Sequence, residues 1–268
     1  MGLGDVLNLP RFHFITSFDQ EGDMTHQSKP KGVLEADYAD ARKTKNELRF
    51  RFRVRGQAVA WAADQYIDPV HRSDLTLLDM GAADGKTMKY IDELLALKQG
   101  IGIEYSPELL QKAENLPANL RLEEGDITNL SNVGDSTFSI VSALALLEHL
   151  TDPVLAVQEA ARILKPGGIF VASSPVPFWD HIAVRLGLLD EGHHECDMHS
   201  KFFKSLFDRT PGLRLVHFRR FMWAPIGLLP YVGLSVSPES AVSIDRAIEK
   251  FKVANCLFVN QLAVAIKE

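Results

Sequence analysis

The sequence predicts an α/β protein whose core is a doubly wound, mostly parallel sheet. In the segment 75–95, an apolar run stops at Gly81. A turn of small residues follows and then a helix, with Met88, Ile91 and Leu95 at three- and four-residue spacings. Further short apolar segments follow between residues 101 and 173, separated by helix-start signals. This alternation of strand and helix is typical of parallel sheets that helices cover on both faces.

The turn at residues 79–85 is the first candidate binding site. Ligands of doubly wound sheets lie beyond the carboxyl ends of the strands. Gly81 and Gly85 have no Cβ, so the backbone can approach a ligand closely there. The turn lacks the G-x-G-x-x-G pattern of dinucleotide-binding proteins, and Asp84 would set a carboxylate against a pyrophosphate at the helix start. These features disfavour NAD and favour a cationic ligand.

Acidic residues mark the ends of the next two predicted strands. Glu104 lies at the end of the strand 101–105, where a carboxylate can accept hydrogen bonds from both ribose hydroxyls of a nucleoside. Asp126 follows the strand 119–124, in a position to accept from an adenine amino group while Ile127 packs on the ring. NAD enzymes also carry an acid at the end of this strand. Glu104 therefore indicates a nucleoside cofactor but does not show which one.

Two more strands are predicted on either side of a helix. The fourth strand covers residues 138–143, and the Asp-Pro pair at 152–153 then opens an amphipathic helix. Residues 164–168 close that helix before a fifth strand at 169–173.

Five segments of this region resemble the class I S-adenosylmethionine-dependent methyltransferases. They are the Asp-x-Gly-x-x-x-Gly turn at 79–85, the acid Glu104, Gly-Asp-Ile at 125–127, Glu-His-Leu at 148–150 and Leu-Lys-Pro-Gly-Gly at 164–168. The resemblance runs from residue 75 to 174 and implies S-adenosylmethionine as cofactor and S-adenosylhomocysteine as product. It assigns the following residues to cofactor binding: Asp79, Gly81, Ala82, Asp84, Gly85, Glu104, Tyr105, Asp126, Ile127, Ala143 and Leu144.

The same resemblance implies the rest of the architecture. The sheet of that family is Rossmann-like and has seven strands with an antiparallel pair at one edge, for which residues 214–220 and 257–266 are the candidates. We expect an N-terminal arm and helical cap at 1–67 and a methyltransferase domain at 68–268. Insertions on the substrate side are expected at about 175–211 and 221–250, after the fifth and sixth strands.

The N-terminal part combines an irregular arm, 1–35, with a basic helical region, 35–67. Residues 49–55 alternate arginine with apolar residues, as a strand would, but helix-forming neighbours on both sides favour a helix. The basic stretch from Arg42 to Arg55 is either a solvated face or a cap that meets an anionic substrate or a lipid headgroup.

Histidines supply the candidate catalytic residues. His149 follows the fourth strand, and residues 191–200 hold three more histidines with a cysteine and three acids. We take His149, His194 and His199 as candidate bases or substrate contacts, because histidine exchanges protons near neutral pH. The spacing in 191–200 matches no standard zinc pattern, so no metal is predicted, and the segment is either part of a substrate pocket or a solvated loop.

The segment 221–234 is apolar but contains two prolines and two glycines, so it cannot span a bilayer as a regular helix. It is predicted to be a lid over a hydrophobic substrate, a peripheral membrane contact or packing on the sheet edge. We therefore favour a small-molecule or lipid-like methyl acceptor. The resemblance points to the subgroup that methylates small molecules, quinones and lipids.

Composition narrows the alternatives. The formal charge of −6 argues against a general nucleic-acid binder, two distant cysteines against a disulfide framework, and the lack of a signal-peptide pattern favours the cytoplasm. Three other functions stay open: an RNA methyltransferase that uses the basic stretch, a non-catalytic S-adenosylmethionine-binding regulatory protein, and a nicotinamide-dependent oxidoreductase.

Overall fold

The computed structural model describes residues 36–113, 115–185, 195–234, 236–249 and 256–268. Its centre is one seven-stranded sheet in the order β3-β2-β1-β4-β5-β7-β6, in which β7 pairs antiparallel with both neighbours and the other pairs are parallel. The strands are β1 (Thr76–Met80), β2 (Gln99–Glu104), β3 (Leu120–Glu124), β4 (Phe138–Leu144), β5 (Leu164–Pro175), β6 (Leu213–Trp223) and β7 (Phe258–Lys267). The predicted doubly wound sheet and its antiparallel pair are confirmed.

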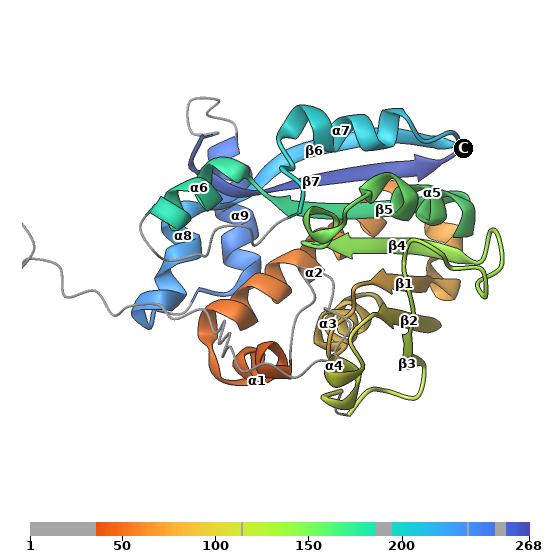
Figure 1. Cartoon of the computed structure of the whole chain (residues 1–268), viewed down its shortest axis with the longest axis horizontal. Helices are drawn as coiled ribbons and strands as arrows, with labels where there is room; N and C mark the ends of the chain where they lie inside the picture. Colours follow the sequence, from red (N-terminus) through yellow and green to blue (C-terminus); the bar gives the residue numbers. More distant parts are fainter. Residues whose placement is uncertain (1–35, 114, 186–194, 235, 250–255) are drawn as a thin grey trace, which may run out of the picture.

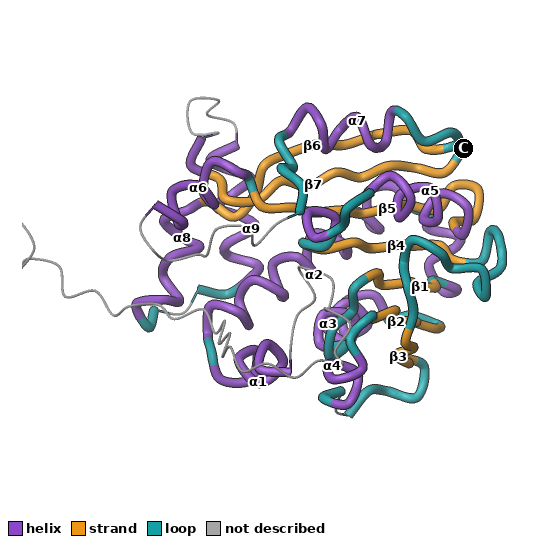
Figure 2. Tube along the Cα trace, in the orientation of Figure 1, coloured by secondary structure: helices purple, strands orange, loops and turns teal. Residues whose placement is uncertain are grey.

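Helices cover both faces of this sheet (Figures 1 and 2). They are α1 (Ala36–Thr44), α2 (Asn46–Tyr66), α3 (Lys86–Leu95), α4 (Pro107–Gln111), α5 (Pro153–Ile163), α6 (Pro177–Arg185), α7 (Ser200–Asp208), α8 (Ala224–Leu228) and α9 (Pro238–Glu249). Short 3₁₀ helices are η1 (Pro69–Asp74), η2 (Leu147–His149) and η3 (Leu229–Val232).

Alternating strand residues divide the core into two layers. Leu77 of β1 packs in a cluster with buried residues of α2, α3 and α9, whereas its neighbour Leu78 packs in a second cluster with α5 and α7. Successive side chains of a strand point to opposite faces, so each buried strand contributes to both clusters. This arrangement explains why the predicted strands are almost continuously apolar.

The strand β5 differs from its prediction. It begins at Leu164, directly after α5, rather than at Ile169. Its pairing with β4 shifts register between Leu164 and Ile169, and Gly167 has a φ of +75°. The expected helix-closing segment is therefore an irregular first part of the strand.

The basic region before β1 is helical, as predicted: α1 and α2 meet at Lys45. The apolar segment 221–234 begins as the end of β6, continues through α8 and η3, and combines buried Phe221 with exposed Leu228 and Leu234. Within the described part of the chain, none of the helices has the length and apolar character needed to cross a membrane. The predicted arm at 1–35 lies outside the described residues.

A close approach of the chain to Gly102 of β2 sets the position of the turn after β1. A Cβ at Gly102 would lie 2.5 Å from the Cβ of Ala82 in that turn and 2.5 Å from a methyl group of Leu122 in β3. Such distances are below any ordinary contact, so the turn packs on β2 only because glycine stands there.

We expect Gly102→Ala to lower the free energy of unfolding by about 1–3 kcal/mol, because the added methyl group overpacks the contact with the turn. Urea denaturation measures the change. Gly134→Ala is the matched control, since its added Cβ would meet only the Thr137 hydroxyl at 3.4 Å. Equal stability of both variants would contradict this account of the turn.

Candidate functional site

Hydrogen bonds hold the turn after β1 against the end of β2. The backbone N–H groups of Gly81 and Ala82 both donate to the carbonyl of Ile103, at 2.9 and 3.1 Å. The Glu104 carboxylate accepts from the N–H of Ala83 through Oε2 at 2.8 Å and from the N–H of Ser106 through Oε1 at 2.9 Å. Glu104 therefore joins the turn to the start of α4.

The backbone of the turn adopts left-handed conformations. Gly81 has a φ of +68° and Gly85, which precedes α3, a φ of +77°. These angles are easily reached by glycine and disfavoured for other residues, which explains both glycines of the motif. A Cβ at Gly81 would also lie 2.6 Å from the side chain of Leu146, which follows β4.

Asp84 is buried in an ionic contact with the N-terminal helices. Its side chain is 0% exposed and pairs with Lys86 and, at 2.8 Å, with Nη1 of Arg42 in α1. Nη2 of Arg42 donates to the Thr87 hydroxyl at 2.7 Å. Arg42 and Lys86 thus offset the charge of Asp84. The expectation that this charge would repel a pyrophosphate or attract a cationic ligand therefore no longer holds.

Asp79 is buried between β1 and β4. The Ser142 hydroxyl donates to its Oδ1 at 2.6 Å. Burial raises the pKa of Asp79 to about 6, although the bond from Ser142 and the charge of Arg42 act to lower it. Asp79 therefore lies inside the strand pair beneath the turn and does not form part of the turn's surface.

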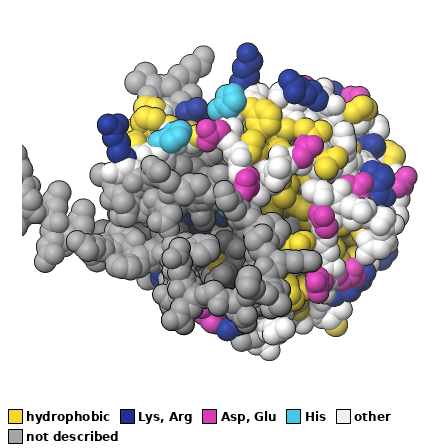
Figure 3. All heavy atoms as spheres, in the orientation of Figure 1, with side chains coloured by type: hydrophobic (Ala, Val, Ile, Leu, Met, Phe, Trp, Pro, Cys, Tyr) yellow, Lys and Arg dark blue, Asp and Glu magenta, His cyan; other side chains and the backbone are white. Residues whose placement is uncertain are grey.

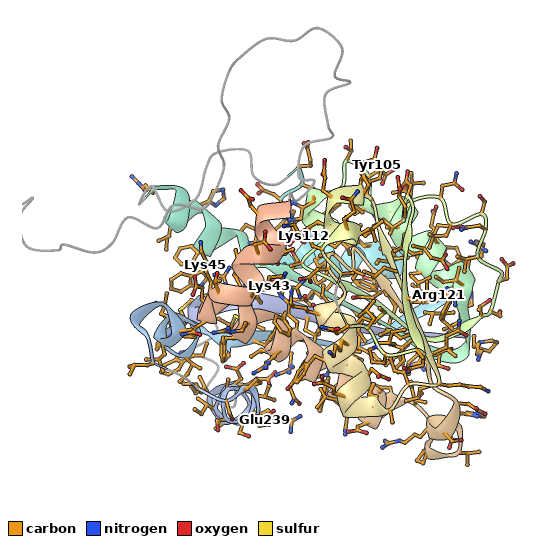
Figure 4. All side chains as sticks on the ribbon, turned by 90° about the horizontal axis from the view of Figure 1, so that it is seen from below. Lys43, Lys45, Tyr105, Lys112, Arg121 and Glu239 are labelled. Carbon is orange, nitrogen blue, oxygen red and sulfur yellow. The ribbon has the colours of Figure 1, made fainter. Side chains whose placement is uncertain are left out.

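The remaining predicted cofactor residues lie at the ends of neighbouring strands. Asp126 uses Oδ1 to accept from the N–H and the hydroxyl of Thr128, at 2.8 and 2.6 Å, which fixes the loop after β3. Ile127 and Ala143 are buried and Leu144 is half-buried. Tyr105 is 52% exposed and lies at the surface (Figure 4).

Two of the three candidate histidines are described. His149 ends η2, which is separated from β4 by two residues, and its Nδ1 atom is buried. The carbonyl of the adjacent Glu148 accepts from the N–H groups of Glu195 and Cys196, at 3.0 and 3.1 Å, so the chain leading to α7 runs beside η2. His199 is exposed before α7, with its Nδ1 3.2 Å from the carbonyl of Asp197.

His194, with the rest of 186–194, lies outside the described residues. Among the residues that are described, no group of three or more His, Cys, Asp or Glu side chains is placed to hold a metal ion.

The basic stretch does not form one exposed face. Arg42 points inward to Asp84, Arg49 donates to the carbonyl of Lys43 at 2.6 Å, and exposed Arg53 lies over the rings of Phe52 and Tyr90. On the described part of the face in Figure 3, Lys and Arg side chains are interspersed with Asp and Glu. Arginines that point in different directions do not favour the RNA alternative, which needs a continuous basic surface.

The structure adds contacts that the sequence pattern did not assign to the site. Arg42 and Ser142 hold the two buried aspartates, and Gly102 admits the turn. Of these three residues, only Gly102 could have been recognised from the sequence, because a glycine inside an apolar strand often marks a close approach of another backbone segment. The partners of Asp84 and Asp79 depend on contacts across 42 and 63 residues of sequence, which no local pattern reports.

Comparisons with known proteins identify the central region. Residues 78–172 match the family model described as "Methyltransferase domain". An uncharacterized methyltransferase of Schizosaccharomyces pombe is 37% identical over 102 residues, covering 34% of this chain and 37% of that protein. A ubiquinone biosynthesis O-methyltransferase of Colwellia psychrerythraea is 29% identical over 105 residues, covering 38% of this chain and 42% of that protein. The chain thus spans less than half the length of these two relatives.

Solved structures share the fold over most of the chain. The methyltransferase in complex with the Trm112 activator from Haloferax volcanii matches with a TM-score of 0.59 at 18% identity, over 88% of this chain and 99% of that one. A geranyl diphosphate C-methyltransferase from Streptomyces coelicolor, in complex with S-adenosylhomocysteine, matches with a TM-score of 0.55 at 15% identity, over 79% and 77%. The fold is that of a class I methyltransferase. Residues 78–172 thus form a methyltransferase domain, and the chain is similar to S-adenosylmethionine-dependent methyltransferases.

We expect Arg42→Gln to lower the free energy of unfolding by about 3 kcal/mol, because Lys86 is then the one partner cation left to the buried Asp84 among the described residues. Urea denaturation measures the change. Lys98→Gln is the control, since Lys98 pairs with Asp74 at the same 2.8 Å but the two side chains are 62% and 67% exposed. Its expected effect is below about 1 kcal/mol. Equal effects would contradict the role of burial.

Asp79 predicts a pH dependence of stability. Its pKa in the folded protein, about 6, exceeds its ordinary value of 3.8, so its contribution is fully present below pH 3.8 and is lost as the pH rises through 6. Asp79→Asn stays neutral, so above that pH we expect it to be more stable than the wild type by up to about 3 kcal/mol. Urea denaturation across this range should show the difference vanish toward pH 3.8; a pH-independent difference would contradict the assignment.

Proposed function

We propose that this chain transfers a methyl group from S-adenosylmethionine to a small-molecule or lipid-like acceptor. The observation that carries the proposal is the joined arrangement of the left-handed turn at Gly81 and Gly85 with Glu104, at the carboxyl ends of β1 and β2. This is the edge of a doubly wound sheet where ligands bind.

The side chains present fit the cofactor. Each carboxylate oxygen has two acceptor positions, so Glu104 can serve a ribose diol while it holds Ala83 and Ser106. Asp126 engages Oδ1 within its own turn, which leaves Oδ2 for the adenine amino group. Gly81, Ala82 and Gly85 would line the methionine end. Asp84 would act indirectly, by anchoring α1 to the turn through Arg42.

The chain's main chemical task is positioning. The cofactor supplies a methyl group that is already activated for transfer. Alignment of the acceptor with that group converts an encounter of two molecules into a reaction within one complex, which can supply most of the rate. The rigid turn and the buried strand ends would hold the cofactor in place. The elements that meet at the same end of the sheet, α1, α2 and η2, would hold the acceptor.

A base is needed only if the acceptor loses a proton. We propose His149 ahead of His199 for this role, since His149 lies in η2, the short helix after β4, whereas His199 is exposed. His194, which lies outside the described residues, remains a candidate base predicted from the sequence.

Two observations support a small or lipid-like acceptor. The ubiquinone biosynthesis O-methyltransferases among the relatives bear the name of a small lipid-like product. The carboxyl end of the sheet is also rimmed by α6 and α8 (Figure 1), where Phe178 and Leu228 are each 57% exposed. Exposed apolar side chains at a binding edge fit an apolar acceptor or the surface that contains it.

Calorimetric titration of the purified protein tests the cofactor site. We expect S-adenosylmethionine and S-adenosylhomocysteine to bind with micromolar affinity and NAD to bind far more weakly. Asp126→Ala removes an exposed acceptor and should weaken both roughly tenfold or more. Glu104→Ala should weaken them at least as much, because it also releases the turn.

Glu124→Ala is the control for these titrations, since Glu124 is an exposed acid at the end of β3, two residues before Asp126. We expect it to bind the cofactor as the wild type does. Preferential binding of NAD, or unchanged affinity in both Glu104→Ala and Asp126→Ala, would refute the proposed site.

A further inference from the structure

One face of α2 carries arginine toward the proposed acceptor site. Ala58 and Ala62 are buried against the sheet, and Arg55 and Arg51 continue the same helical stripe at three- and four-residue spacings. The C-terminal end of α2 leads through η1 to the start of β1, so its N-terminal half extends toward the carboxyl ends of the strands (Figure 1). Arg51 and Arg55 therefore face the edge where the cofactor and the acceptor would meet.

Arg55 is held there without a compensating partner. It is half-buried, and its Nε atom is fully buried without a hydrogen-bond partner among the described residues. Burial lowers the pKa of the Arg55 guanidinium and the adjacent Arg51 lowers it further, whereas Tyr38 and Glu148 act to raise it. Desolvating a cation without pairing it is unfavourable, so the arrangement indicates a missing anionic partner.

Neighbouring groups do not supply that partner. Arg42, the other inward arginine, is already engaged by Asp84 and Thr87. Glu148 of η2 is 1% exposed and acts electrostatically on Arg55, but no ion pair joins these two described residues. The acceptor side of the site thus presents a guanidinium whose planar fork matches a carboxylate or a phosphate.

We propose that the methyl acceptor carries an anionic group, a carboxylate or a phosphate, and that Arg55 binds it with Arg51 beside it. This inference rests on the proposed function, because it assigns the acceptor of the same site. The anion would orient the acceptor from the α2 side, and the atom to be methylated would point toward the turn at Gly81. The same chemistry could be presented by a soluble acceptor or by an anionic lipid headgroup.

Anion binding can be measured before the acceptor is identified. The full chain is saturated with S-adenosylhomocysteine and titrated calorimetrically with inorganic pyrophosphate, with benzoate and with benzamide, the neutral counterpart of benzoate. We expect the two anions to bind and benzamide not to bind. Arg55→Gln should weaken anion binding roughly 10- to 100-fold, because a hydrogen-bonded charge pair is lost.

Arg53→Gln is the matched control, since it removes the same charge from the opposite, exposed face of α2. It should bind the anions as the wild type does. Arg55→Lys keeps the charge without the fork and should retain part of the affinity, which guards against a folding defect in Arg55→Gln.

Sedimentation with vesicles of phosphatidylcholine, with and without phosphatidylglycerol, distinguishes the two sources of the anion. Arg55-dependent binding to the anionic vesicles assigns a lipid headgroup. Binding of the free anions without binding to these vesicles assigns a soluble acceptor.

Equal anion affinity in Arg55→Gln and the wild type would overturn the proposal, as would equal binding of benzoate and benzamide. Loss of S-adenosylhomocysteine binding in Arg55→Gln would overturn it differently, by assigning the guanidinium to the carboxylate of the cofactor. Failure of the wild type to bind S-adenosylhomocysteine at all refutes the proposed function. The same anion titrations without cofactor then show separately whether Arg55 binds anions.

Discussion

The contact between the turn after β1 and the end of β2 is the constraint on which the site depends. The turn leaves β1 in a left-handed conformation, donates two backbone hydrogen bonds to Ile103 and a third to the Glu104 carboxylate, and fits only because Gly102 has no side chain. A carboxylate that accepts backbone N–H groups is fixed in orientation. The residue proposed to bind ribose is therefore positioned by the segment proposed to bind methionine.

The buried pair of Arg42 and Asp84 extends this constraint to the N-terminal helices. The pair joins α1 to the turn before α3. Lys112, the residue after α4, pairs with Asp40 of α1 at 2.6 Å, and Figure 4 labels Lys112 close to Lys43. A buried ion pair tolerates little displacement, because separated charges would be left unsolvated. The exposed pair adds less. The N-terminal helices are thus held to the turn after β1 by Asp84, the acid that the sequence pattern assigned to the ligand.

The sequence was sufficient where local patterns decide the structure. Local patterns located the five parallel strands β1 to β5, the family resemblance supplied the candidates for β6 and β7, and the glycines of the turn indicated its left-handed backbone conformation. It was insufficient where the partner is distant: Asp84 and Asp79 appear as acids near a ligand, and only the fold shows that Arg42 and Ser142 engage them. The start of β5 was misplaced because Pro166 and the two glycines after it resemble a helix end but form an irregular strand.

In the proposed site, the arginines of α1 and α2 would have separate roles: Arg42 would support the cofactor turn, and Arg55 would select the acceptor. The segment in which arginines alternate with apolar residues is helical, so Arg53 and Arg55 point to opposite sides of α2. The arginines of this basic stretch therefore face different parts of the molecule. Arg42 neutralises the turn and Arg55 keeps its charge uncompensated by any described carboxylate at ion-pair distance. Under the proposal, such a cation beside the turn would discriminate among acceptors by charge, since a neutral acceptor would leave Arg55 desolvated and unpaired.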